Sequence, residues 1–112
     1  MANDFKSATA TSLAIDSGTY STLYTAPGSK TSIILEVDIA NKHSADITDS
    51  VLISDSSGSN DAFIVKAAPE PVGGALKVVS GQKIVMETGD VLKAAASVAS
   101  AADAVVSILE DV

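Results

Sequence analysis

The stretch Thr31–Asn41, TSIILEVDIAN, decides the fold class. Its residues divide into two alternating sets, with Ile33, Leu35, Val37 and Ile39 on one face and Ser32, Ile34, Glu36 and Asp38 on the other. Apolar residues at every second position are typical of a β-strand that buries one face. We therefore expect a strand over this whole stretch, with the first set facing the core.

Turn signals recur on both sides of this strand at intervals of about ten residues, which is typical of an antiparallel sandwich or barrel. Pro27 followed by Gly28 predicts a type II turn, with Gly28 at positive φ. Pro69 and Pro71 cannot donate ladder hydrogen bonds, so they place their segment at a sheet edge or in a crossing loop. The expected strands are residues 12–15, 19–26, 31–41, 47–54 (interrupted by Asp49), 62–67, 75–80, 82–87, 91–98 and 103–112.

The sequence thus predicts an all-β protein, an antiparallel β-sandwich of jelly-roll or immunoglobulin-like type with about eight short strands. Residues 17–112 form the expected sandwich domain. Residues 1–16 are an N-terminal arm or edge strand, with a frayed terminus as the alternative. Within this segment Asp4, Phe5 and Lys6 are the candidate interface residues, because Phe5 gives the arm one apolar anchor.

The Ala-rich C-terminal segment leaves two structures open. Alanine is the best helix former, which favours a helix over about residues 100–109. The β-branched pair Val105 and Val106, and the alternation around it, favour a last strand instead. We expect the strand.

Charge and composition exclude several classes of function. The 112 residues contain 14 acidic residues, seven lysines and no arginine, giving a net charge of −7. Nucleic-acid binding and anionic membrane surfaces both require clustered basic residues, so we expect neither partner. The chain has no cysteine, no signal-peptide pattern at its start and no apolar run near the ~18 residues of a membrane span. We expect a soluble protein made in a cytoplasm.

Four segments resemble catalytic or ligand-binding motifs only weakly. His43, the single histidine, is the natural candidate for acid–base chemistry, but its loop shows no nucleophile motif around it. Residues 28–31, GSKT, lack the glycine spacing of a phosphate-binding loop. Residues 55–61, DSSGSND, offer oxygen ligands for a cation without the spacing of a calcium loop. Glu87 and Asp90 flank a hairpin tip, where a carboxylate pair for glycoside hydrolysis would lack aromatic platforms.

We therefore expect no enzyme, no cofactor and no metal site, and read these segments as turns and loops. Two other hypotheses stay open. The first is a carbohydrate- or cation-binding adhesion module that uses the loops at residues 43–49 and 55–61. The second is a hydrolase that depends on His43.

Two longer stretches resemble a known group of proteins. TLYTAPGSKTSIILEVDIAN (residues 22–41) is similar to the opening strand–turn–strand of small structural proteins from tailed phages, among them marine phages and cyanophages. AFIVKAAPEPVGGALKVVSGQKIVMETGDVLKAAAS (residues 62–97) resembles their second half. The best matches are Pro27-Gly28 after LYTA and Gly89-Asp90 after KIVME. The resemblance covers about residues 19–110.

This resemblance implies a β-sandwich component of the virion without catalytic residues. It implies a capsid decoration or cement protein that binds the major capsid protein on the outer surface of the head, after assembly in the host cytoplasm. A homo-oligomer is expected. A neck or tail component that binds neck or tail proteins is the alternative within the same family.

Overall fold

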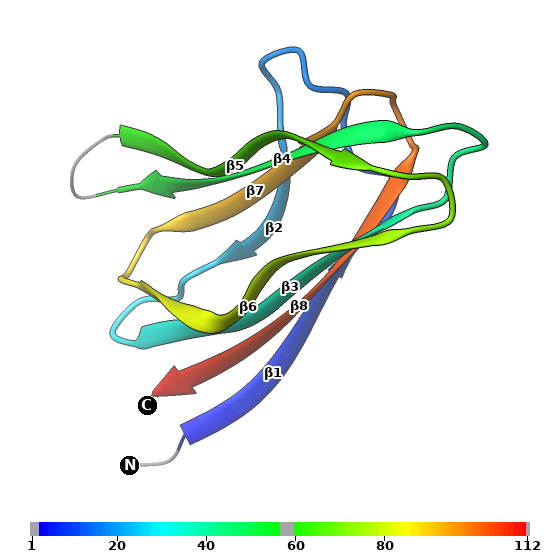
Figure 1. The fold of residues 1–112 in the computed structure, drawn as a ribbon. Helices are drawn as coiled ribbons and strands as arrows, with labels where there is room; N and C mark the ends of the chain where they lie inside the picture. The colour runs from blue at the N-terminus through cyan, green and yellow to red at the C-terminus, as the bar shows by residue number, and fades with distance from the viewer. Residues whose placement is uncertain (1–2, 57–59, 112) are drawn as a thin grey trace.

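The computed structural model describes residues 3–56 and 60–111, which form eight β-strands in two four-stranded sheets (Figure 1). Sheet A has the order β1-β8-β3-β6, and sheet B has the order β2-β7-β4-β5. None of the described residues belongs to a helix that could cross a membrane. The strands are β1 Asn3–Ala10, β2 Ser21–Thr25, β3 Thr31–Asn41, β4 Ile47–Asp55, β5 Asn60–Glu70, β6 Ala75–Met86, β7 Val91–Ala96 and β8 Ala102–Asp111.

The strand pairing is that of a jelly roll. β1 pairs with β8, β2 with β7, β3 with β6 and β4 with β5, and every pair is antiparallel. This is the pattern of one long hairpin folded over on itself, which brings strands far apart in sequence side by side. The predicted all-β antiparallel sandwich is therefore confirmed, in its jelly-roll rather than its immunoglobulin-like form.

The N-terminal segment lies within the sandwich. β1 pairs with β8 over its whole length, from Asn3 with Asp111 to Ala10 with Ala104, and forms the edge of sheet A. Beyond β1, Leu13 is completely buried in the core, and its N–H donates to the carbonyl of Ala102. The strand expected at residues 12–15 is wrong, because this segment makes only one isolated parallel bridge, at Ile15.

The core between the sheets consists mainly of small aliphatic side chains, as the composition indicated. It is nearly free of aromatic rings, and Phe5 and Phe63 both lie exposed on the surface. The largest fully buried apolar side chains are Leu13, Ile34, Ile39, Met86, Leu92 and Ile108.

β3 has the predicted bounds, but its buried face changes side halfway along. The buried side chains of β3 are Ser32, Ile34, Val37, Ile39 and Asn41. The predicted core face is thus right for Val37 and Ile39. It is wrong for Ile33 and Leu35, which are partly exposed. The register with both neighbouring strands shifts between Ile34 and Glu36. Against β8, Leu35 is therefore the extra residue of a β-bulge, and a bulge reverses the inward and outward alternation.

Residues 75–86 form one strand, β6, where the sequence predicted two strands separated by a turn at Ser80-Gly81. The pairing of β6 with β3 shifts register opposite this point, and Lys83 has a φ of 53°. The residues of β6 between Ser80 and Ile84 bulge out of the ladder, so the strand bends there and continues. β5 likewise runs through Pro69. It lies at the edge of sheet B, which is one of the two positions that the proline left open.

The turn between β2 and β3 also differs from its prediction. The left-handed residue is Ser29, with a φ of 61°, and Gly28 has no positive φ. Ala26 donates to the Asp90 carbonyl and accepts from the Gly89 N–H. These two bonds keep the chain extended beyond the end of β2. We attribute to them that the chain turns at Ser29, one residue later than predicted. At the other end of the chain, the expected strand is confirmed, since β8 covers the Ala-rich segment that left a helix open.

Asp49, which interrupts the apolar pattern of β4, lies in the core beside a second carboxyl, that of Glu70 in β5. Both side chains are almost completely inaccessible to solvent, and their four oxygens lack ordinary hydrogen-bond partners among the described residues. Burial raises the pKa of Asp49, and burial together with the neighbouring Asp49 raises the pKa of Glu70 to about 8. Of the two carboxyls, Glu70 is the one whose pKa lies near neutral pH.

Candidate interaction surface

The structure separates the three residues that the sequence proposed as an interface. Asp4, Phe5 and Lys6 are consecutive in β1, so their side chains alternate between the two faces of sheet A. Lys6 pairs in register with the buried Ile108 and so lies on the inner side, at the rim of the core. Asp4 shares that side. Phe5 alone points outward, and 77% of its surface is exposed.

On the outer face of sheet A, Phe5 begins a continuous row of apolar side chains. It pairs in register with Leu109 of β8, Leu109 pairs with Ile33 of β3, and Ile33 pairs with Val85 of β6. Val85 is 62% exposed, while Ile33 and Leu109 are partly buried by their neighbours. We call these four residues the outer apolar row. The row crosses the whole sheet, near the end where the chain termini lie (Figure 1).

Polar side chains border the outer apolar row on the same face. The next row consists of Ser7, Ser107, Glu36 and Ser80. Beyond it, Lys77 of β6 lies 3.7 Å from both Glu36 and Asp38 of β3, measured from its Nζ to a carboxylate oxygen. A contiguous apolar patch with a polar rim is typical of a surface that binds another protein.

A buried carboxylate ties β1 to the rest of the sandwich below this row. Glu110 of β8 is 3% exposed, and its Oε1 lies 3.1 Å from Lys6 Nζ and 3.6 Å from Lys30 Nζ. Tyr24 donates its hydroxyl proton to the other carboxylate oxygen of Glu110, and the Tyr24 hydroxyl also lies 2.7 Å from the Ser32 hydroxyl. The Glu110 carboxylate thus joins strands of both sheets.

These contacts shift two pKa values in opposite directions. The hydrogen bond from Tyr24, followed by the bond and the charge of Lys6, lowers the pKa of Glu110. Burial and the hydrogen bond to Glu110 raise the pKa of Tyr24 to about 12. The lowered pKa keeps Glu110 ionised near neutral pH, where its carboxylate pairs with Lys6 on the edge strand that carries Phe5.

Sequence reasoning missed three members of the outer apolar row. It placed Ile33 on the core face, assigned no role to Leu109 and treated Val85 as one apolar residue of a short strand. The signal that could have found the row is the surplus of apolar residues at outward positions. Reading that signal requires the strand order and the register, which the sequence does not supply.

His43 and the residues 28–31 form parts of loops. His43 is partly buried in the connection between β3 and β4, and its backbone N–H donates to the Asn41 side-chain oxygen over 2.8 Å. Residues 28–31 form the turn between β2 and β3 and the first residue of β3. Lys30, from this turn, faces Glu110.

The loop at residues 55–61 lies partly outside the described residues, since residues 57–59 fall in the gap. Asp90 closes the β6–β7 turn: its Oδ2 accepts the Glu87 N–H over 2.9 Å, and its Oδ1 accepts the Ser56 N–H over 3.1 Å. The Glu87 side chain is exposed. Within residues 3–56 and 60–111, no group of three or more His, Asp or Glu side chains is arranged to hold a metal ion.

The chain matches no family model, no curated protein and no solved structure. Its function is therefore inferred from the chemistry of its surface. The jelly-roll topology alone does not indicate a function, because proteins with unrelated activities share it.

Proposed function

We propose that this chain is a structural protein of a tailed-phage virion, a decoration or cement protein that binds and stabilises the assembled head. The observation that carries the proposal is the outer apolar row, an exposed apolar strip that crosses sheet A and ends at the edge strand β1. The resemblance of residues 19–110 to small phage structural proteins supports the same assignment.

The modest size of the row suits binding to a lattice. Four side chains, two of them partly buried, cover less area than a stable one-to-one complex requires. A capsid repeats the same contact many times by symmetry, so a small contact on each copy is sufficient when copies also link neighbouring subunits. A protein that binds only the assembled lattice then stabilises that lattice by mass action.

The proposed partner is the major capsid protein, with sheet A facing the capsid and sheet B facing outward. Further copies of the chain are the second proposed partner. On the side away from β8, β1 has no neighbouring strand in sheet A within the described part of the chain. The backbone groups on that side are available for pairing with a strand of another chain.

The experiment is co-sedimentation of the purified protein with mature heads that were assembled without it. We expect saturable binding, at a simple ratio to the major capsid protein, and heads that resist heat better once the protein is bound. Unassembled capsid protein serves as the control and is expected to bind much more weakly. Absence of binding to mature heads would refute the proposed function.

A further inference from the structure

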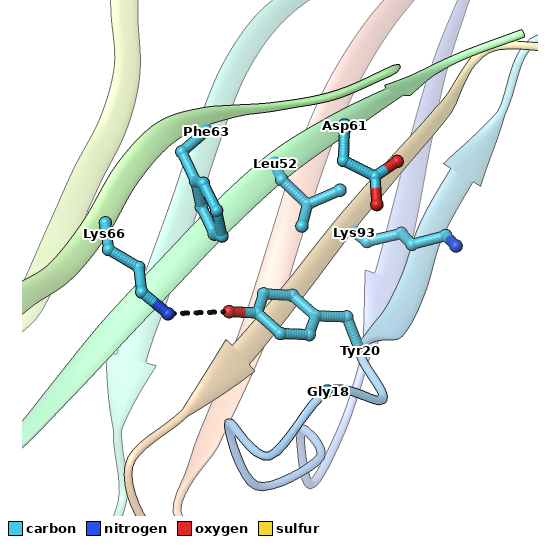
Figure 2. Close-up of a pocket in the computed structure, with 7 residues that line it drawn as sticks. All are labelled: Gly18, Tyr20, Leu52, Asp61, Phe63, Lys66 and Lys93. Carbon is cyan, nitrogen blue, oxygen red and sulfur yellow. Dashed lines mark hydrogen bonds between the residues drawn. The ribbon is translucent and has the colours of Figure 1, made fainter. Parts of the chain in front are cut away.

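A pocket opens on the outer face of sheet B, opposite the outer apolar row. It has a volume of about 280 Å³, close to the lower end of the ~300–1,000 Å³ range of small-molecule sites. Figure 2 shows Tyr20 and the loop at Gly18 on one side, with Phe63 and Leu52 facing them. The lining residues are Gly18, Tyr20, Leu52, Asp61, Phe63, Lys66 and Lys93.

One wall of the pocket is held in place by a connected set of polar and ring contacts. Tyr20 donates its hydroxyl proton to Asp16 Oδ1 over 2.6 Å, and Lys66 Nζ lies 3.2 Å from Asp16 Oδ2. Lys66 Nζ also lies 4.9 Å from the centre of the Phe63 ring. The Phe63 and Tyr20 rings meet edge to face, with 6.2 Å between their centres. The two aromatic rings are therefore positioned before any ligand binds.

The floor of the pocket comes from the register of sheet B. Lys93 of β7 pairs with Leu52 of β4, and Leu52 pairs with Phe63 of β5. Leu52 is 5% exposed although it lies on the outer face of the sheet, because the pocket walls cover it. Phe63, in contrast, is 49% exposed and offers a ring surface to a ligand.

Two charged groups of the pocket have no ion-pair partner among the residues that the structure describes. They are the ammonium group of Lys93 and the carboxylate of Asp61. The other lysine, Lys66, is neutralised by Asp16. In Figure 2, Lys93 and Lys66 lie at opposite ends of the Tyr20 ring, so the unpaired cation stands apart from the paired one.

We infer that this pocket binds one acidic sugar residue of the hexuronic acid class. The sugar carboxylate pairs with Lys93, its hydroxyl groups donate to the Asp61 carboxylate, and its apolar C–H face packs against Phe63 and Tyr20. The ammonium group, the carboxylate and the aromatic rings of the pocket thus each have a counterpart on one compact ligand.

The same groups argue against neighbouring ligand classes. A neutral hexose leaves the ammonium group of Lys93 without a partner. An aromatic acid such as benzoate fits the rings and can pair with Lys93, but it has no hydroxyl group to donate to Asp61. A longer, strongly anionic chain is disfavoured by the net charge of −7 on the protein.

The test is an NMR titration of the ¹⁵N-labelled protein with sodium glucuronate, with glucose and benzoate as comparison ligands. We expect saturable shifts at pocket amides with a Kd in the millimolar range, which is ordinary for so small a ligand. Glucose and benzoate are expected to bind about tenfold or more weakly, because each lacks one of the pairings. Binding of glucuronate is also expected to weaken as salt is added.

Two variants and one control identify the site. Lys93→Met keeps the aliphatic stem of the side chain and removes the charge, and it is expected to weaken glucuronate binding about tenfold. Phe63→Ala is expected to weaken it about two- to tenfold. Lys77→Met on sheet A is the matched control and should leave binding unchanged. Unchanged binding in both pocket variants, equal binding of glucose, tighter binding of benzoate, or no saturable shifts would each overturn the inference.

This inference is independent of the proposed capsid role, because the pocket and the outer apolar row lie on opposite sheets. Weaker glucuronate binding by Phe63→Ala, together with unchanged binding to heads, would support both assignments. A failed glucuronate titration would leave the co-sedimentation result untouched, so the two failures are distinguishable.

Discussion

Truncation of Phe5 to alanine should separate binding from folding. Phe5 is 77% exposed, so the isolated sandwich gains little from its ring. Complete burial of a phenylalanine side chain is worth roughly 1.5–3 kcal/mol, and the exposed share of Phe5 corresponds to about 1–2 kcal/mol on docking. At about 1.4 kcal/mol for each factor of ten, the affinity of one copy for the capsid should fall about 5- to 30-fold.

The assay is co-sedimentation with mature heads over a range of protein concentrations, combined with urea unfolding of the free protein. We expect the binding curve of Phe5→Ala to move to higher concentration while the free energy of unfolding changes by about 0.5 kcal/mol or less, as for an exposed position. Phe63→Ala is the matched control, since it removes the same side chain from a half-exposed site on sheet B and should leave head binding unchanged.

Two results would refute the reasoning. If Phe5→Ala binds heads as tightly as the unaltered protein, the outer apolar row is not the docking surface. If Phe5→Ala and Phe63→Ala weaken binding equally, the contact does not distinguish sheet A from sheet B, and the proposed orientation fails.

Three further predictions concern stability. Glu70→Gln should flatten the pH dependence of the free energy of unfolding. The pKa of Glu70 in the folded protein, about 8, lies above its ordinary 4.5, so the unaltered protein should lose roughly 2–4 kcal/mol of stability between pH 5 and pH 8. Urea unfolding over this pH range should show a smaller loss for the variant. Glu110→Gln should lower the free energy of unfolding by about 1–3 kcal/mol at pH 7. This difference should shrink as the pH falls below 4.5, because Glu110, whose pKa is lowered in the folded protein, stabilises the fold only while it is ionised. Gly89→Ala should lower the stability measured by thermal unfolding by about 1–2 kcal/mol, because Gly89 has a φ of +87° and an added Cβ would lie 2.9 Å from Ser56 Oγ. The control Gly28→Ala has open space around the added Cβ and should be nearly neutral.

The sequence predicted the features that depend on local pattern. The bounds of β3 and the β-structure of residues 102–111 followed from alternation, because one buried face imposes period two on a strand. The edge position of β5 was one of the two that Pro69 left open, because a proline lacks the N–H that a central strand must donate. These predictions needed no knowledge of which strand lies next to which.

Features that depend on pairing were beyond the sequence. The bulge at Leu35 is set by the register of β3 against β8, and it moved Ile33 from the predicted core face to the outer surface. Asp49 looked like a break in the pattern, because its partner Glu70 lies 21 positions further along, on another strand. The two carboxyls meet only through the pairing of β4 with β5, which the sequence alone does not give.

Both candidate sites depend on distant segments for the same reason. The outer apolar row takes one residue from each of four strands, and only the strand order β1-β8-β3-β6 makes these residues neighbours. The pocket requires the loop at Gly18 to bring Tyr20 over the outer face of sheet B, against Phe63. A jelly roll places most contacts between residues far apart in sequence, so its surfaces are the part least visible in the sequence.

The central claim is that this chain decorates a phage head, and the most direct measurement is its copy number per virion. Quantitative mass spectrometry of purified particles gives this number relative to the major capsid protein. The proposal predicts a ratio near one or a simple fraction of it, as a contact repeated over the lattice requires. A few copies up to about a dozen would assign the chain to the neck, the tail or a single vertex, and absence from the particle would contradict a structural role in the virion altogether.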